Sequence, residues 1–308
     1  MPFTVNMTGT AQVDDSVKTD FETDFIIEYE QTNVMDEFVE FNRMIGAKSL
    51  SFPRYSLLGL ATTPLTEDED ATSSALADSS ILITPAEYGN VITHTELADL
   101  QTGGRSSRAA VRLVATNMAE TRNALATLAL EGTSNVVYGG DATATANIDA
   151  ADVMSAAVLD KVYNKLNRQN VPKLGGMYIA FMHDDVIHDL RTGSAAGTWQ
   201  DVNKYNNDLR VLANEVGMFK GFRIITNNHA SIGVDAGATT TDVYTSTFLG
   251  RNGLGLAESA VPELRVTGPF DKLGRFLNIG WYGVFKYSII ESEAVYKVES
   301  ASSIGDNA

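Results

Sequence analysis

The chain has 308 residues, of which 44% are hydrophobic, and its 39 acidic against 23 basic side chains give a formal net charge of −16. The absence of cysteine excludes disulfides, thiolate metal ligands and a cysteine nucleophile, and no apolar run approaches the roughly 20 residues that cross a membrane. The excess of negative charge argues against tight or sequence-specific nucleic-acid binding, because proteins that bind nucleic acid present a basic face.

The first third of the chain carries nearly all of the excess negative charge. Residues 1–104 contain 18 Asp and Glu but only 4 Lys and Arg. A region of this kind can be a solvated acidic tail. Apolar residues spaced through it, such as Phe21 and Phe25, favour an ordered arm over a tail. A short helix is expected over residues 34–45, ending at Gly46.

An extended loop is the next predicted feature. Two strand-like runs, residues 49–56 and 80–92, flank an acidic tip at residues 66–74. Pro53 and Pro64 disfavour a central position in a sheet, so the runs are expected to form an edge element or an extended hairpin. Ordering each residue costs about 1–2 kcal/mol of backbone entropy, and this loop has too little apolar surface to pack on itself. It must therefore lie on something else, and a second copy of the chain is the expected partner.

Residues 105–131, after Gly103-Gly104, form the clearest predicted helix. Gly132 supplies the left-handed position that often ends a helix. Twenty-seven residues would span about 40 Å, and the apolar residues make one narrow stripe along that length. A long helix with a single stripe is expected to lie across the edge of a core. The stripe consists of Val111, Val114, Met118, Leu125 and Leu128.

Three arginines, Arg105, Arg108 and Arg112, lie in the first turns of this helix. Their spacings of three and four residues place them on one face. That face is either solvated or meets acidic groups of a neighbouring subunit. On the second hypothesis the leading candidates are the residues of the acidic tip, which are Glu67, Asp68, Glu69 and Asp70.

The remainder of the chain predicts a mixed α and β structure. A second helix is expected over residues 150–169, with Asp149 as its N-cap, and a further helix over residues 202–216. A buried strand is expected over residues 177–182. The strongest strand signal covers residues 277–289, where apolar and polar residues alternate over thirteen positions, as in a long strand with one buried face. Shorter strands are expected over residues 221–226 and 243–249.

The sequence offers no constellation of catalytic, metal-binding or cofactor-binding residues. His183 and His188 are five residues apart, which does not place them on one face as zinc ligands. The Gly-rich run GRNGLG at residues 250–255 matches no phosphate-binding motif, and the acidic tip lacks the alternating spacing of a calcium loop. An enzyme is therefore not predicted, and no cofactor is expected.

Several stretches, taken in order, resemble the major capsid protein of tailed bacteriophages, which has the Hong Kong ninety-seven-like fold. The resemblance covers essentially the whole chain. It rests on ATTPLTEDEDATSSAL, ILITPAEYGNVITHTELAD, LALEGTSNVVYGG, GFRIITNNHA, VYTSTFLGRNGLG and GPFDKLGRFLNIGWYGVFKY.

The resemblance implies an α+β fold with an N-terminal arm, an extended loop, a spine helix, and peripheral and axial domains. On this pattern the segments are the arm, 1–47; the extended loop, 48–104; the peripheral domain with the spine helix, 105–147, and its C-terminal strands, 262–308; and the axial domain, 148–261.

The function that the resemblance implies is self-assembly into the hexamers and pentamers of an icosahedral shell around double-stranded DNA. The shell would belong to the virion and be assembled in the cytoplasm of a bacterial host. A separate scaffolding protein, a portal protein and a decoration or cement protein are the implied partners, and a membrane is not. An alternative is the shell of a bacterial nanocompartment of the same fold, which would enclose an enzyme. Terminase and portal genes, or a cargo-enzyme gene, beside this gene would separate the two.

The chain departs from some relatives in the positions of its lysines. They cross-link covalently through a lysine in the extended loop, whereas this chain has no lysine between Lys48 and Lys161. Non-covalent contacts are therefore expected to hold the shell.

Overall fold

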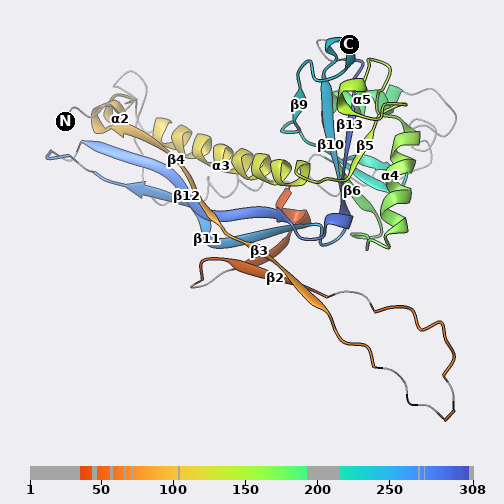
Figure 1. Ribbon diagram of the computed structural model, residues 1–308. Coiled ribbons are helices and arrows are strands. Elements are labelled where there is room, and N and C mark those ends of the chain that lie inside the picture. Colours follow the sequence, from red (N-terminus) through yellow and green to blue (C-terminus); the bar gives the residue numbers. More distant parts are fainter. Residues whose placement is uncertain are drawn as a thin grey trace.

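The computed structural model describes most of the chain, and Figure 1 shows its arrangement. The described residues are 35–43, 47–55, 58–65, 67–68, 70, 73–102, 105–192, 215–269, 271–273 and 275–304. Phe21 and Phe25 lie outside this set, as does most of the helix expected over residues 202–216. The last two positions of that expected helix begin a strand instead.

Helices and strands alternate irregularly along the chain. The strands are β1 (Glu40–Arg43), β2 (Leu50–Tyr55), β3 (Asp78–Ile83), β4 (Ala86–Thr95), β5 (Val136–Tyr138), β6 (Tyr178–Met182), β7 (Glu215–Phe219), β8 (Phe222–Thr226), β9 (Ile232–Gly233), β10 (Val243–Leu249), β11 (Leu254–Thr267), β12 (Phe276–Ile289) and β13 (Val295–Ser300). The α-helices are α2 (Glu96–Thr102), α3 (Arg105–Glu131), α4 (Ala156–Arg168) and α5 (Asp184–Thr192). Short 3-10 helices are η1 (Met35–Phe38), η2 (Thr145–Asn147), η3 (Ala238–Thr240) and η4 (Ser292–Ala294).

Two sheets form the body of the molecule (Figure 1). The four-stranded sheet has the order β1–β11–β12–β4, in which β1 runs parallel to β11 and the other pairs are antiparallel. The seven-stranded sheet has the order β5–β13–β10–β6–β8–β7, and β9 pairs with β10. Strands β2 and β3 form a separate antiparallel hairpin. The fold is therefore α+β, as predicted.

The helix α3 packs along the four-stranded sheet, with the bounds that the sequence predicted. Val111, Val114 and Met118 are buried against Trp281 and Phe285 of β12. Leu128, however, is 65% exposed, so the predicted stripe is wrong at its end. Seventeen residues after Val111, it lies about 100° away around the helix. The buried face continues instead through Ala115, Ala126 and Leu130.

The strand β12 confirms the alternating pattern that predicted it. Ile279, Trp281, Phe285 and Tyr287 are buried beneath α3, while Lys286 is exposed. The indole nitrogen of Trp281 donates to the Asn117 side chain of α3 at 3.0 Å. Burial and this hydrogen bond therefore hold the long helix against the long strand.

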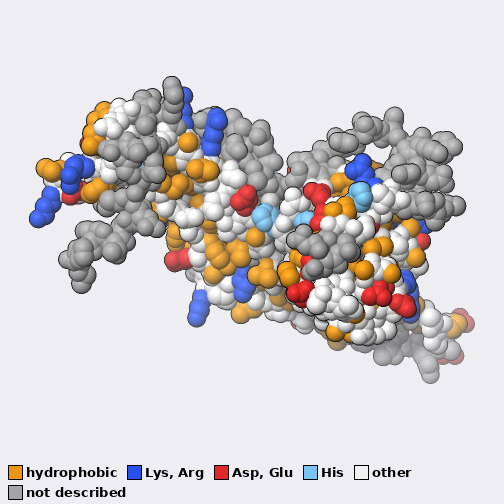
Figure 2. Space-filling model, turned by 90° about the horizontal axis from the view of Figure 1, so that it is seen from above, with side chains coloured by type: hydrophobic (Ala, Val, Ile, Leu, Met, Phe, Trp, Pro, Cys, Tyr) orange, Lys and Arg blue, Asp and Glu red, His pale blue; other side chains and the backbone are white. Residues whose placement is uncertain are grey.

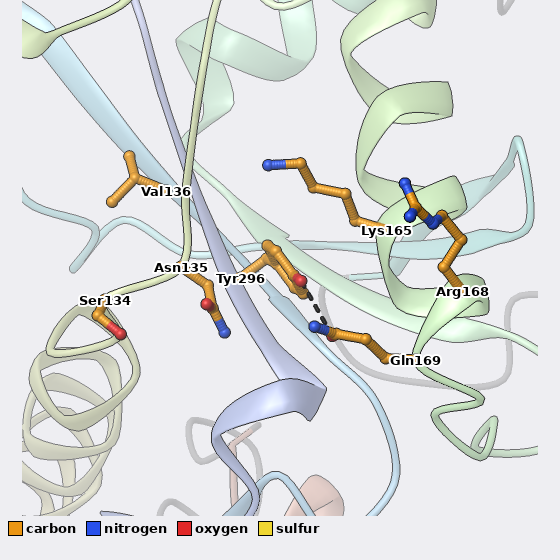
Figure 3. A pocket seen from close by; sticks show the side chains of 7 residues that line it. All are labelled: Ser134, Asn135, Val136, Lys165, Arg168, Gln169 and Tyr296. Atoms are coloured by element: carbon orange, nitrogen blue, oxygen red, sulfur yellow. Dashed lines mark hydrogen bonds between the residues drawn. The ribbon is translucent and has the colours of Figure 1, made fainter.

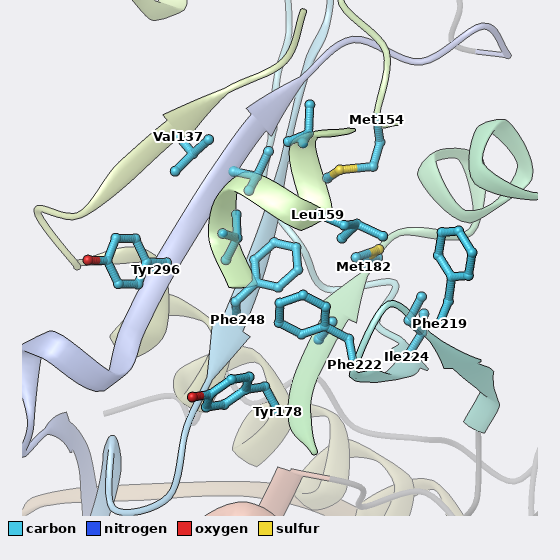
Figure 4. Close-up of a cluster of buried hydrophobic side chains, with 14 of the residues drawn as sticks. Val137, Met154, Leu159, Tyr178, Met182, Phe219, Phe222, Ile224, Phe248 and Tyr296 are labelled. Atoms are coloured by element: carbon cyan, nitrogen blue, oxygen red, sulfur yellow. The ribbon is translucent and has the colours of Figure 1, made fainter. Parts of the chain in front are cut away.

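A second core fills the space between α4 and the seven-stranded sheet (Figure 4). The rings of Phe222 and Phe248 lie 5.1 Å apart, edge to face. The helix α4 begins at Ala156, after Ser155, and not at residue 150 as predicted. Asp149 does not cap it, because the Asp149 carboxylate accepts the Ala151 N–H within a tight turn. The residues that α4 buries are Val158, Leu159, Val162 and Leu166.

The helix expected over residues 34–45 is a single 3-10 turn, η1, followed by β1. Phe38 ends η1, and its ring packs against Phe181 of β6 at 5.6 Å. The next residues then pair with β11 in parallel register, Glu40 opposite Gly255. The open edge of β11 determines the conformation here, because an unpaired strand edge binds an extended segment readily.

The strand run expected over residues 80–92 is two strands in two different sheets. β3 ends at Ile83 and β4 begins at Ala86. Pro85 lies between them and has no N–H for a ladder. The sequence does not predict β11, which begins within the Gly-rich run at residues 250–255. Neither β5 nor β13 was predicted.

The predicted domain boundaries stay a prediction. The pairing of the strands would divide the chain at other residues. β11, which begins at residue 254, pairs with β12 in the four-stranded sheet, whereas β13 pairs with β10 in the seven-stranded sheet. Both sheets contribute to one continuous apolar cluster through Phe181, Ile225 and Phe285. The body is therefore joined by a shared core and not by a flexible linker alone.

Candidate assembly surface

The β2–β3 hairpin carries the projecting part of the predicted extended loop, and it is anchored to the body at its base. Phe52 of β2 and Ile83 of β3 are buried, and they form a small apolar cluster with Ala257 and Ile290. Leu50 and Ile81 pack around this cluster. The hairpin therefore has a fixed direction where it leaves the four-stranded sheet, although it contributes little to the main core.

An ion pair strengthens the base. The Arg54 guanidinium of β2 pairs with the Glu291 carboxylate, just beyond β12. Burial raises the pKa of Glu291 by more than the positive charge of Arg54 lowers it. The contact therefore orients the hairpin, while its net contribution to stability is small because both groups are partly solvated.

Beyond this base none of the described loop residues is buried against the body. Every described residue from 58 to 80 is exposed, and Figure 1 shows the loop projecting far from both sheets. Leu60 and Leu65 are 90% and 80% exposed. We call the four large apolar residues of this segment the loop leucines, and they are Leu58, Leu60, Leu65 and Leu76.

The predicted acidic tip and the predicted arginine face are not brought together within one subunit. Glu67, Asp68 and Asp70 are exposed at the loop tip, and Glu69 lies outside the described residues. Arg105 is the first residue of α3. In Figure 1 the start of α3, beside α2, and the loop lie at opposite ends of the view.

Arg108 and Arg112 are exposed on α3. A contact between this face and the tip would therefore require two subunits.

The body also has exposed apolar side chains. Leu97 and Leu100 of α2 are exposed, as are Leu113 and Leu128 of α3. Seen from above (Figure 2), hydrophobic side chains form several separate groups on this face, between charged and polar ones. Exposed apolar groups of this size are ordinary on a monomer when they are scattered, so the loop remains the more informative surface.

A buried charge cluster joins the segment of η1 and β1 to the body. The Arg122 guanidinium of α3 lies 2.8 Å from the Asp36 carboxylate and 3.8 Å from the Glu258 carboxylate of β11. Its Nε atom donates to the Tyr287 hydroxyl at 3.1 Å, and that hydroxyl donates to Asp36. The Arg122 guanidinium also lies 4.9 Å from the centre of the Phe285 ring.

Glu258 is the least solvated carboxylate of this cluster. Burial raises its pKa, while the charge of Arg122 lowers it by a smaller amount. The sequence does not predict this cluster, although one residue of α3 breaks the apolar pattern. Arg122 comes four residues after Met118 in the apolar stripe of α3, and a charge at such a position requires a buried partner.

The described residues contain no group of histidines and carboxylates arranged to hold a metal ion. His183 lies 3.2 Å from the Asp185 carboxylate, and the Asp185 N–H donates to its ring nitrogen. His188 is exposed, on α5. Within the same described part of the chain, no helix combines the length and hydrophobicity needed to cross a membrane.

Comparison with known sequences gives no identification, because neither a family profile nor a curated protein matches the chain. Solved structures do match. The capsid protein of Ralstonia phage GP4 is similar with a TM-score of 0.73 and 14% identity, over 89% of this chain and 93% of that one.

Two further structures extend the likeness. The capsid protein of cyanophage Pam1 is similar with a TM-score of 0.69 and 13% identity, over 90% of this chain and 94% of that one. A virus-like particle from Pyrococcus furiosus is similar with a TM-score of 0.53 and 10% identity, over 90% and 97%. The projecting loop, the long helix beside a long strand and these full-length likenesses together establish that the chain has the fold of phage major capsid proteins, the Hong Kong ninety-seven-like fold.

Proposed function

We propose that the chain is the major capsid protein of a tailed bacteriophage, and that its copies form the hexamers and pentamers of an icosahedral shell around double-stranded DNA. The observation that carries the proposal is the loop over residues 58–80, whose described residues are all exposed. The fold, which phage capsid proteins share, supports it.

A loop of this kind needs an external partner. Holding a residue in one conformation costs about 1–2 kcal/mol, and contacts with its own subunit do not offset this cost beyond the hairpin base. Burying a leucine side chain contributes about 1.5–3 kcal/mol. Four loop leucines on a neighbouring subunit would therefore supply several kcal/mol for each copy, and a closed shell repeats the contact at every subunit.

The acidic tip and the arginine face form the second part of the proposal. The tip of one subunit would lie against Arg105, Arg108 and Arg112 of a neighbour. The separation of the two regions within one subunit favours a contact between subunits, because neither region reaches the other in its own chain. Exposed ion pairs each contribute only about 0.2–1 kcal/mol. This contact would therefore determine how neighbouring subunits are aligned more than it would stabilise the shell.

The other implied partners follow from the same proposal. A separate scaffolding protein would guide assembly in the bacterial cytoplasm, a portal protein would occupy one vertex, and a decoration or cement protein would bind the finished virion. A nanocompartment shell is the less favoured reading, because the likeness to the Ralstonia phage capsid is greater than that to the Pyrococcus virus-like particle.

The decisive experiment removes the projecting loop and keeps its base. Tyr55 and Asp78 are opposite each other in the β2–β3 ladder, so an Asn-Gly pair can replace residues 56–77 as a tight hairpin turn. The subunit should unfold at the same temperature as the parent chain, because Phe52 and Ile83 remain buried. Shells should be absent by negative-stain electron microscopy.

A second variant separates loop length from loop chemistry. It keeps every residue of the loop except the four loop leucines, which become serine. Loss of shells in both variants would assign the contact to the leucines. Normal shells from the shortened chain would overturn the proposal.

A further inference from the structure

An open cavity of about 410 Å³ lies beside the end of α4 (Figure 3). Three segments far apart in the sequence line it. The turn after α3 contributes Ser134 and Asn135, the start of β5 contributes Val136, and β13 contributes Tyr296. The last turn of α4 and the residue after it contribute Lys165, Arg168 and Gln169.

The lining is positively charged although the chain as a whole is strongly negative. Lys165 and Arg168 both border the cavity, and the lining contains no carboxylate. Among the described residues neither cation forms an ion pair, whereas Lys297 on β13 pairs with Glu299 at 3.1 Å. The Lys165 ammonium lies 5.7 Å from the centre of the Tyr296 ring, a contact that leaves its N–H groups available.

Hydrogen bonds fix the neutral side chains of the cavity. The Tyr296 hydroxyl donates to the Gln169 side-chain oxygen at 2.9 Å. Burial raises the pKa of this hydroxyl above its ordinary value, so the group stays protonated at neutral pH. Because Gln169 accepts through its oxygen, its amide N–H groups are left to donate elsewhere. The Asn135 amide is held by the Ser292 and Val295 carbonyls, at 2.7 and 3.2 Å.

The end of α4 has an electrostatic effect of the opposite sign. A helix C-terminus carries about half a negative charge, which stabilises Lys165 and Arg168 and opposes an incoming anion. Two full positive charges exceed this half charge. The Glu293 carboxylate, which is not part of the lining, also acts on the Tyr296 hydroxyl and reduces this excess without adding a negative group to the lining itself.

We propose that this cavity is a binding site for a phosphate group. A guanidinium, an ammonium and an amide from one helix end, with the Ser134 hydroxyl opposite, supply more donors than the two oxygens of a carboxylate can use. Arginine and lysine together are the usual partners of phosphate oxygens. The group would be either free phosphate or a phosphodiester of nucleic acid. The site does not depend on the proposed shell function.

The test measures stabilisation of the full-length protein by inorganic phosphate, with chloride and acetate at equal ionic strength as references. A ligand that binds only the folded state stabilises it by RT ln(1 + [L]/Kd), so Tm rises with ligand concentration and more steeply for a smaller Kd. Phosphate should raise Tm above both references. Lys165→Met and Arg168→Met should each weaken the apparent Kd about tenfold, which is the effect of one lost charged hydrogen bond. The double variant should show no phosphate-dependent rise.

The matched control is Lys161→Met, one turn earlier on the same exposed side of α4 and outside the cavity lining. It should keep the full response. A mixed-sequence duplex oligonucleotide then identifies the source: competition with phosphate that needs Lys165 and Arg168 assigns a phosphodiester, and its absence assigns free phosphate. An equal Tm rise in acetate, no rise above chloride, or a full response in the double variant would each overturn the proposal.

Discussion

Arg122 occupies a position on α3 where the helical pattern calls for an apolar side chain. Its guanidinium contacts groups from η1, β11 and β12, so a single residue connects the N-terminal segment, the long helix and the four-stranded sheet. A buried ion pair of this kind adds little net stability compared with a well-packed apolar cluster. Removing one partner is nevertheless costly, because it leaves the other charges buried and unpaired. The cluster therefore fixes how the segment docks more than how strongly the molecule folds.

Replacing this arginine should be costly. Arg122→Met would leave the Glu258 carboxylate buried without its positive neighbour and Asp36 without its ion-pair partner, although the Tyr287 hydroxyl would still donate to Asp36. We expect the free energy of unfolding to fall by about 3 kcal/mol, the lower end for a broken buried pair, because Asp36 is a quarter exposed. Urea unfolding of the unassembled subunit measures the change.

The control for this variant is Lys286→Met, at an exposed position of β12, which should change stability by no more than about 0.5 kcal/mol. Adding Asp36→Asn and Glu258→Gln to Arg122→Met should restore part of the loss, because the stranded charges are then gone. A loss for Arg122→Met no larger than that of the control would contradict the role of the cluster.

At the scale of secondary structure, the elements that the sequence predicts well are those whose signal is local. The apolar pattern of α3 extends over 27 residues and that of β12 over 14. Both elements can therefore be predicted without knowing what they pack against. β1 differs, because residues 40–43 are extended only through pairing with β11, more than 200 positions later. β11 itself contains Pro262 and two shifts of register against β12, which interrupt the alternation that marks a strand.

The candidate surfaces divide in the same way. The projecting loop is predictable because two strand signals, an acidic tip and prolines are adjacent in the sequence. The cavity beside the end of α4 is not predictable from the sequence. Asn135, Lys165 and Tyr296 meet there only after the turn following α3, the end of α4 and β13 have packed together. The Arg122 cluster is partly predictable. The sequence shows that a charged residue interrupts the apolar stripe of α3, but it does not show which residues pair with it.

Charge reversal tests the proposed contact between the loop tip and the spine helix. Changing Arg105, Arg108 and Arg112 to glutamate should reduce shell assembly at low salt, because the tip would then meet like charges. The same change should not unfold the subunit, since acidic residues in the first turn of a helix are favoured by its dipole. Sedimentation separates shells from free subunits.

The matched rescue reverses the other partner in the same chain. Changing Glu67, Asp68, Glu69 and Asp70 to lysine should partly restore assembly, and added salt should diminish both effects by screening. If the combined variant assembles no better than the arginine variant, the tip has another partner and the arginine face is a solvated surface.

At the scale of the whole molecule, the packed body and the exposed loop are separate parts of the chain. The two sheets share a core through Phe181, Ile225 and Phe285, whereas the described residues of the loop between Tyr55 and Asp78 are exposed and project from this body. A rigid body with a projecting loop suits a surface lattice, because the body sets the angles between neighbours and the loop spans the seam between them. The stability of such a shell depends on many repeated weak contacts.

The chemistry of the loop determines whether those contacts become covalent. An isopeptide bond between subunits needs a side-chain amine, and no lysine occurs between Lys48, before β2, and Lys161 in α4. The loop leucines and the acidic tip provide only burial and charge pairing. Purified shells boiled in detergent should therefore give a single band near 33.2 kDa on a denaturing gel. A ladder of heavier bands that survives boiling, and that disappears in a Lys48→Arg variant, would instead show a covalent link through the base of the loop.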